Sequence, residues 1–115
     1  MRTMLAAKLH GLTVTGASLD YNGSVSIDSA VMAQADILPG EQVHVVSLST
    51  GARWVTYALP AEHGEFTVNG AGARLAQPGD RVIVMTYRSS DERSPATALF
   101  FGLGNEVIRT VWPYP

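Results

Sequence analysis

A short motif that occurs twice constrains the fold of this chain more than any other feature of its sequence. Residues 39–45 read Pro-Gly-Glu-Gln-Val-His-Val, and residues 78–84 read Pro-Gly-Asp-Arg-Val-Ile-Val. In each copy a Pro-Gly turn leads into a segment whose valines favour a β-strand. We interpret the copies as two related halves of a closed barrel, because many short strands joined by regular turns favour closure. Two similar turns can also produce so short a match by chance.

The rest of the chain also consists mostly of short strand-like segments. Strands are expected at residues 3–15 (one or two strands), 25–27, 42–48, 53–59, 66–68, 81–87, 97–101 and 107–111. Asp28 is a good N-cap for one helix over residues 29–35, where Ala, Met and Gln favour helix. Residues 88–95 are expected to form a loop, and the proline-rich residues 113–115 cannot continue a central strand.

Local patterns add three more specific expectations. The Asn-Gly pairs at residues 22–23 and 69–70 predict turns, and the first predicts a tight hairpin because Asn-Gly suits positive φ angles. Arg53 and Tyr57 lie four residues apart on an alternating strand, so their side chains share one face. Residues 81–87 are apolar on both sides, which is typical of a strand buried on both faces.

Composition excludes several classes of protein. A chain of 115 residues, 46% hydrophobic and 16% charged, is expected to form one globular domain over residues 1–115. With a formal charge of −2 and no basic block, a nucleic-acid surface is not expected. The absence of cysteine excludes disulfides and thiolate ligands, and His10, His44 and His63 have no metal-ligand spacing. We therefore expect no metal site. No apolar run approaches the length of a membrane span, so we expect a cytoplasmic protein.

The pair Gly23-Ser24 carries the sharpest chemical hypothesis, although Asn-Gly-Ser is also an ordinary hairpin sequence. A serine hydroxyl needs an activating neighbour or a polarised target before it acts as a nucleophile. Glycine's conformational freedom would let the Ser24 oxygen reach the carbonyl of Gly23. Three other motifs accompany this pair in the chain. Together the four motifs, which are Lys8 with His10, Tyr21-x-Gly23-Ser24, Arg53-x-x-Thr56-Tyr57 and Asn69-Gly70-Ala71, resemble the aspartate 1-decarboxylase family.

The resemblance implies a mainly β fold, a small double-psi β-barrel with one or two short helices, and a homotetramer with active sites between neighbouring subunits. It also implies self-cleavage between Gly23 and Ser24 into a β chain of residues 1–23 and an α chain of residues 24–115. The Ser24 hydroxyl attacks the preceding carbonyl to form an ester, elimination cleaves the chain, and hydrolysis leaves a pyruvoyl cofactor. Thr56 and Asn69 are the implied processing residues, since a hydroxyl and an amide can both donate to a developing oxyanion.

By the same resemblance the enzyme converts L-aspartate to β-alanine and CO₂ for pantothenate biosynthesis. The pyruvoyl group forms a Schiff base with the substrate amine and accepts the electrons that decarboxylation releases. Arg53 and Lys8 would bind the two substrate carboxylates, and Tyr57 would donate a proton to the carbanion. The implied catalytic residues are Ser24 and Tyr57, and the implied substrate-binding residues are Lys8, His10, Arg53, Asn69, Gly70 and Ala71.

Three residues depart from the family pattern. Gly72 and Arg74 stand where the family usually has an alanine and a histidine, so Gly72 loosens the backbone of the expected pocket and Arg74 adds a cation near it. Gly11 follows His10 where a charged residue is more common. Two alternatives therefore stay open. Beside an aspartate decarboxylase, the chain could be a relative that decarboxylates another acidic amino acid, or a non-catalytic barrel of the same fold, a binding or assembly module with an intact Ser24.

Overall fold

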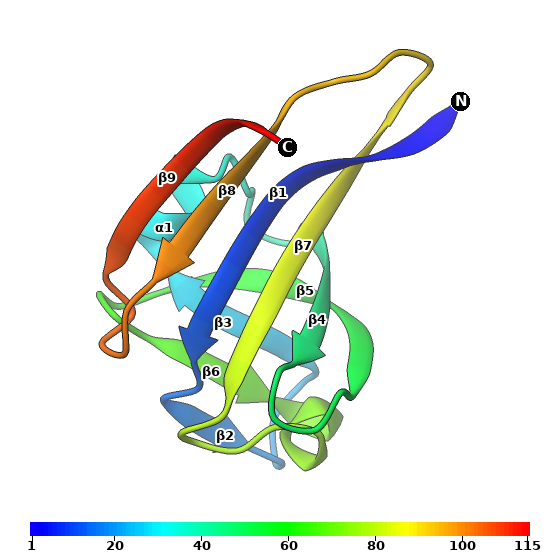
Figure 1. The fold of residues 1–115 in the computed structure, drawn as a ribbon. Helices are drawn as coiled ribbons and strands as arrows, with labels where there is room; N and C mark the ends of the chain where they lie inside the picture. Colours follow the sequence, from blue (N-terminus) through cyan, green and yellow to red (C-terminus); the bar gives the residue numbers. More distant parts are fainter.

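A computed structural model describes residues 1–115 as one sheet of nine strands with one α-helix and one 3₁₀-helix (Figure 1). The prediction of a small, mainly β fold with one or two short helices is confirmed. In chain order the elements are β1 (Arg2–Thr13), β2 (Gly16–Ser18), β3 (Ser24–Asp28), α1 (Ser29–Gln34), β4 (Gln42–Ser47), β5 (Arg53–Ala61), β6 (Phe66–Asn69), η1 (Gly70–Arg74), β7 (Arg81–Ser90), β8 (Ala96–Phe101) and β9 (Val107–Tyr114).

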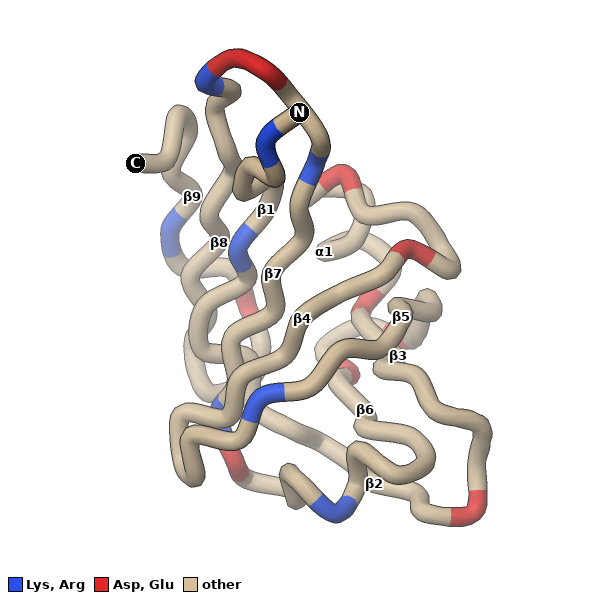
Figure 2. Tube along the Cα trace, turned by 90° about the vertical axis from the view of Figure 1, so that its right-hand side faces the viewer, with Lys and Arg blue, Asp and Glu red and all other residues tan.

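The sheet closes into a barrel because the continuous segment β1–β2 pairs with strands at both ends of the series β6-β3-β5-β4-β7. The strand order is β2-β6-β3-β5-β4-β7-β1-β8-β9. Only Val14 and Thr15 separate β1 from β2, and the Thr15 N–H donates to the carbonyl of Phe66 on β6. The β1–β2 segment therefore borders both β7 and β6 and completes a barrel. Figures 1 and 2 show β1 and β7 on one side of this barrel and β3 and β6 on the other, with β8 and β9 added beside β1.

The two strands that follow the repeated Pro-Gly turns lie next to each other. β4 and β7 pair antiparallel, with Val45 opposite Val84. Both valines are fully buried in a core cluster of 20 residues. Burying a valine side chain contributes about 1.5–3 kcal/mol, so these inward-facing positions are what hold the two halves together. No helix is long and apolar enough to cross a membrane.

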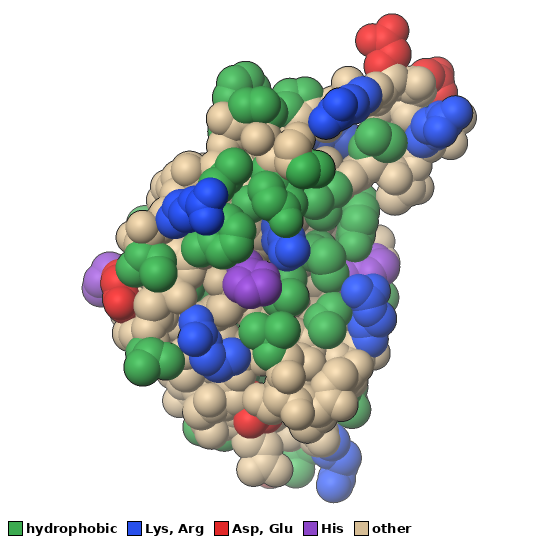
Figure 3. Space-filling view, in the orientation of Figure 1, with side chains coloured by type: hydrophobic (Ala, Val, Ile, Leu, Met, Phe, Trp, Pro, Cys, Tyr) green, Lys and Arg blue, Asp and Glu red, His purple; other side chains and the backbone are tan.

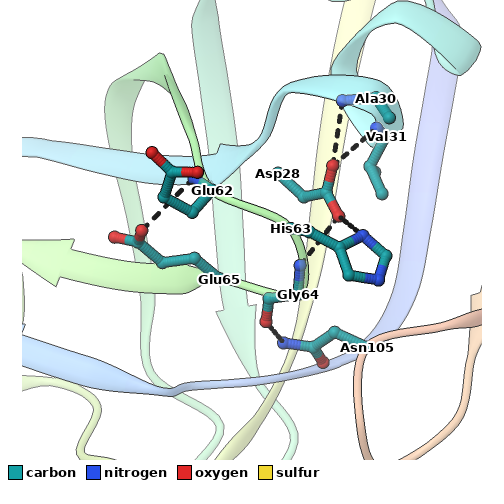
Figure 4. A network of polar contacts seen from close by, with 8 residues as sticks. All are labelled: Asp28, Ala30, Val31, Glu62, His63, Gly64, Glu65 and Asn105. Carbon is teal, nitrogen blue, oxygen red and sulfur yellow. Dashed lines mark hydrogen bonds and ion pairs between the residues drawn. The ribbon is translucent and has the colours of Figure 1, made fainter.

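Asp28 fastens the end of β3 to two neighbouring segments (Figure 4). As the N-cap of α1, its carboxylate accepts hydrogen bonds from the backbone N–H groups of Ala30 and Val31. The other carboxylate oxygen accepts from the Gly64 N–H at 2.8 Å and lies 3.2 Å from Nδ1 of the exposed His63. Burial by itself would raise the pKa of Asp28, but these hydrogen bonds outweigh it and lower the pKa below its usual value.

We expect Asp28→Ala to lower the free energy of unfolding by about 1–2 kcal/mol at pH 7, the usual range for a lost N-cap. The pKa of Asp28 is lower in the folded chain than the value of about 3.9 for an unfolded one. The stabilisation is therefore complete above about pH 4 and is lost as the pH falls through the lower folded-state value. Urea unfolding at pH 7 and pH 3 measures this difference, with the exposed Asp20→Ala as control. Equal destabilisation at both pH values would contradict the assignment.

The tight hairpin predicted at residues 22–23 is wrong. Neither residue has a positive φ angle, and β2 and β3 do not pair with each other. Both strands pair instead with β6, which lies between them. The chain therefore crosses over β6 in an open bend, and this leaves Gly23 exposed at the start of β3. The turn predicted at residues 69–70 is confirmed, because Gly70 has φ +73° and begins η1.

Strand lengths also differ from expectation at the C-terminal half. The residues 88–90 expected in a loop continue β7, because they pair with the first residues of the long β1. The last strand, β9, runs through Pro113 to Tyr114. Proline is tolerated there because β9 is the edge of the sheet, as the rule against prolines in central strands requires.

Candidate active site

Ser24 is placed against Asn69 by the register of two strands. β3 and β6 run antiparallel with Ser24 directly opposite Asn69, and both residues are buried, with 1% and 6% of their surface exposed. The Asn69 side-chain amide donates one hydrogen bond to the Ser24 hydroxyl at 3.0 Å and another to the Ser26 hydroxyl at 3.0 Å. An amide nitrogen has two hydrogens, so both donors of Asn69 are engaged. Asn69 thus fixes the position of the Ser24 oxygen.

Ser26 belongs to this group but was not among the residues that the sequence analysis selected. It lies two residues after Ser24 on the same strand, so both side chains point to the same side. That spacing of two was the available signal. Ser26 shares the Asn69 amide with Ser24, and changes at either serine therefore alter how firmly the other is held.

Gly70 lets the backbone of η1 approach the Gly23 segment closely. A Cβ atom at Gly70 would lie 2.8 Å from both the Cα and the N of Gly23, and 2.8 Å from the carbonyl oxygen of Tyr21. Contacts this short with backbone atoms cannot be relieved by a side-chain movement. Glycine at position 70 is therefore required for the observed path of residues 21–23, just before Ser24.

A small cavity of about 230 Å³ opens beside this segment. Four of the predicted residues line it together with three residues of β5 and η1 that were not predicted and one that follows η1. Its lining consists of Gly23, Trp54, Val55, Thr56, Asn69, Ala71, Gly72 and Leu75. The Thr56 side chain forms no hydrogen bond within the chain in the structure, so its hydroxyl is a free donor beside Gly23. The structure thus brings Gly23, Ser24, Thr56, Asn69, Gly70 and Ala71 into one region.

Trp54 explains why position 72 is glycine here, where the family usually has alanine. A Cβ atom at Gly72 would lie 2.9 Å from Nε1 of Trp54 and 3.1 Å from a methyl group of Val68. The indole ring therefore occupies the space that a larger residue at position 72 would need, and the two positions together shape this wall of the cavity. Arg74, expected to add a cation near the pocket, is exposed and does not line the cavity.

The other predicted residues lie on the outer face of the sheet. Arg53 and Tyr57 are exposed on β5, whereas Thr56 between them is half-buried, so the predicted alternation is confirmed. Lys8 and His10 lie on β1 and are partly exposed. The ladder from His10 through Ile83 and Val46 to Arg53 places these residues in one row.

This outer face is hydrophobic around its charged and histidine side chains. Figure 3 shows hydrophobic side chains gathered over β8, β1 and β7, with a histidine and a basic side chain among them. Ile83 and Met85 on β7 are only half-buried in the single chain. The prediction that residues 81–87 are buried on both faces therefore holds for the inner face alone.

In a single chain, the predicted residues of the outer face do not line the cavity that lies beside Gly23. None of Lys8, His10, Arg53 and Tyr57 lines the cavity beside Gly23. Lys8 and His10 lie on β1, which pairs with β7 and β8, whereas Arg53 and Tyr57 lie on β5, which pairs with β3. Within one chain, Arg53 and Tyr57 therefore lie one strand away from Ser24, whereas Lys8 and His10 lie on a strand that does not pair with β3.

The surroundings of His10 favour the neutral form of its ring. Burial is the main cause that lowers the pKa of His10, and the positive charges of Lys8 and Arg81 lower it further. Its Nδ1 atom is buried without a hydrogen-bond partner, and its ring packs on Phe100 with the ring centres 5.4 Å apart. No three histidine, aspartate or glutamate side chains converge as metal ligands.

The fold and the site place this chain in the class of small closed β-barrel proteins that bury a serine directly after a glycine. Comparison with known families agrees with this class, because the family described as aspartate decarboxylase matches residues 1–102. The chain belongs to the aspartate decarboxylase family.

Relatives in several bacteria are similar over most of their length. Aspartate 1-decarboxylase 1 of Gloeobacter violaceus is 57% identical over 117 residues, covering 96% of this chain and 99% of the relative. Aspartate 1-decarboxylase 2 of the same organism is 58% identical over 89 residues, covering 76% of this chain and 71% of the relative. The aspartate 1-decarboxylase of Moorella thermoacetica is 52% identical over 98 residues, covering 84% of this chain and 77% of the relative.

Proposed function

We propose that this protein is an aspartate 1-decarboxylase, a carboxy-lyase that forms β-alanine and CO₂ from L-aspartate after it cleaves itself between Gly23 and Ser24. The relatives that carry this name support the reaction. The observation that carries the proposal is the buried Ser24 hydroxyl, held at 3.0 Å by Asn69 next to an exposed Gly23. A serine in an ordinary surface turn would have no reason to be buried and oriented in this way.

In the proposed self-cleavage, the Ser24 oxygen attacks the Gly23 carbonyl carbon. A C–O bond forms, the C–N bond breaks, and the Ser24 nitrogen becomes a free amine. Elimination then releases residues 1–23 as a carboxylate, and water converts the dehydroalanine at position 24 to a ketone with loss of ammonia. Thr56 has the free hydroxyl to donate to the developing oxyanion, because both Asn69 donors are engaged by serines.

The residues around Ser24 fit a pyruvoyl group at that position. Asn69 would remain beside it, and the neighbouring cavity of about 230 Å³ leaves room for a small amino acid. A pyruvoyl group supplies an electron sink for the electrons that decarboxylation releases. Arg53 would clamp one substrate carboxylate, since a guanidinium binds carboxylate through two hydrogen bonds.

Lys8 would bind the other carboxylate, neutral His10 would add a polar contact, and Tyr57 would deliver the proton that replaces CO₂. None of these residues lines the cavity beside Gly23 in the single chain, so the proposal includes a homo-oligomer in which one subunit covers the Ser24 cavity of another. The half-buried hydrophobic residues of that face support such an interface. A tetramer and a cytoplasmic location, which the family resemblance predicts, stay predictions.

Intact-protein mass spectrometry combined with a product assay tests this function. We expect two fragments, residues 1–23 and a modified chain from residue 24, and β-alanine from aspartate but not the corresponding amine from glutamate. A single full-length species after prolonged warming, without product, would instead favour the non-catalytic barrel. Two fragments that act faster on glutamate would move the substrate to another acidic amino acid and leave the maturation chemistry intact.

A further inference from the structure

The structure assigns Tyr114, on the C-terminal strand, as a positioning residue that holds Lys8 for a substrate carboxylate. This inference rests on the proposed function, because it presupposes that Lys8 binds substrate. Lys8 Nζ donates a hydrogen bond to the Tyr114 hydroxyl at 3.3 Å and lies 5.5 Å from the centre of the same ring. Two contacts with one side chain restrict a lysine that would otherwise move freely on its four-carbon stem.

The register of the sheet explains why these two residues meet although 106 positions separate them in the sequence. On β8, Ala98 pairs with Lys8 of β1, and Ala96 pairs with Tyr114 of β9. Residues two apart on a strand point to the same side, so the side chains of Lys8 and Tyr114 flank one stretch of β8. Alanine at both central positions leaves room for the longer side chains to reach across.

Tyr114 is itself held by aromatic neighbours. Its ring packs edge-on against Phe100 with the centres 6.5 Å apart, and Phe100 packs against His10. Arg109 also lies over Phe100, 5.4 Å from the centre of its ring. Aromatic pairs favour tilted and edge-on arrangements of this kind, which stabilise both rings. Tyr114 is therefore ordered by the same row of residues that includes His10, and it offers Lys8 a fixed hydroxyl.

Fixing Lys8 lowers the entropy that the side chain must lose when a carboxylate binds. The ammonium group has three donors, so one hydrogen bond to Tyr114 leaves two for a substrate. A hydroxyl is neutral and accepts this bond without neutralising the charge, whereas a carboxylate partner would compete with the substrate. The contact thus orients Lys8 and keeps its positive charge available.

Kinetics of Tyr114→Phe, which removes only the hydroxyl, test the assignment. We expect KM for aspartate to rise about three- to tenfold, the factor that a net hydrogen bond near 1 kcal/mol gives, with kcat changed less than about twofold. Tyr87→Phe is the matched control, because the Tyr87 hydroxyl contacts only the sulfur of Met85. Competitive inhibition by succinate should weaken in Tyr114→Phe while inhibition by propionate does not. An unchanged KM, or equal losses with both inhibitors, would overturn the inference.

A double-mutant cycle separates this inference from the role proposed for Lys8. If Lys8→Met leaves KM unchanged, the substrate-binding role of Lys8 fails. If Lys8→Met raises KM, Tyr114→Phe should add little in that background, because its effect acts through Lys8. A full additional effect of Tyr114→Phe in the Lys8→Met protein would refute the positioning role alone.

A measurement on Lys8 itself does not depend on activity. Lys8 is the only lysine in the chain, so lysine labelled with ¹³C at the ε-carbon gives NMR signals from this residue alone. In the unaltered protein the ring current of Tyr114 should displace these signals from their position in an unstructured peptide. Tyr114→Leu should return them toward that position, and Tyr87→Phe should not. Signals already at the unstructured position in the unaltered protein would contradict the contact, even if the protein proved to have no decarboxylase activity.

Discussion

Replacing Ser24 with alanine should leave the chain as a single uncut polypeptide that forms no detectable β-alanine. Alanine lacks the hydroxyl that attacks the Gly23 carbonyl, so neither the cleavage nor the ketone can arise. The fold should survive, because the change removes one oxygen from a buried site at a cost of roughly 1–3 kcal/mol for the Asn69 donor left unpaired. Intact mass, product formation and a thermal unfolding curve measure the three expectations.

Ser26→Ala is the matched control for this variant. It removes the other hydroxyl that Asn69 binds, two residues away on the same strand, and leaves Ser24 in place. We expect it to mature and to decarboxylate aspartate, with at most a several-fold slower maturation because Asn69 is held less firmly. A Ser24→Ala protein that still produced β-alanine would exclude Ser24 as the origin of the cofactor.

Tyr57→Phe should mature normally and then turn over about 10²- to 10⁴-fold more slowly, the usual contribution of a positioned proton donor. Tyr57 points away from Thr56 on β5 and does not line the cavity beside Gly23, which is why cleavage should not depend on it. Its exposed phenol would instead deliver a proton after CO₂ leaves. The kcat of the matured protein and the fraction of cleaved chain measure the two effects.

Because phenylalanine keeps the ring, KM should change far less than kcat in Tyr57→Phe. Tyr87→Phe again serves as control, since it removes a hydroxyl from a second, half-buried tyrosine of the outer face. Turnover within twofold of the unaltered enzyme would remove Tyr57 from the proton-donor role. Loss of cleavage in Tyr57→Phe would place this residue in maturation instead.

Elements with a strong local pattern could be predicted from the sequence. The alternation along β5 identified which residues share a face with Arg53, and Asp28 marked the start of α1 as its N-cap. Both signals are local, because side-chain direction in a strand and hydrogen bonds at a helix start depend on residues a few positions apart. The aspartate decarboxylase family could also be recognised, because its motifs are short and separate.

Local patterns failed where a distant strand decided the pairing. The Asn-Gly pair before Ser24 has the composition of a hairpin, yet β6 lies between β2 and β3 and pairs with both. The place of β9 at the edge of the sheet, and thus the contact between Tyr114 and Lys8, likewise depends on pairings between the two ends of the chain. No periodicity within a short window reports such contacts.

The sequence by itself determined the kind of chemistry available, namely a serine after a glycine, one lysine and a small set of carboxylate-binding and proton-donating side chains. It also determined the positions of most strands. Only the tertiary structure decided which of these side chains meet: Ser24 and Asn69 across one ladder, and Lys8 and Tyr114 across β8. The reason is physical, because strand order and register depend on how the whole core packs, and a sequence read locally contains neither.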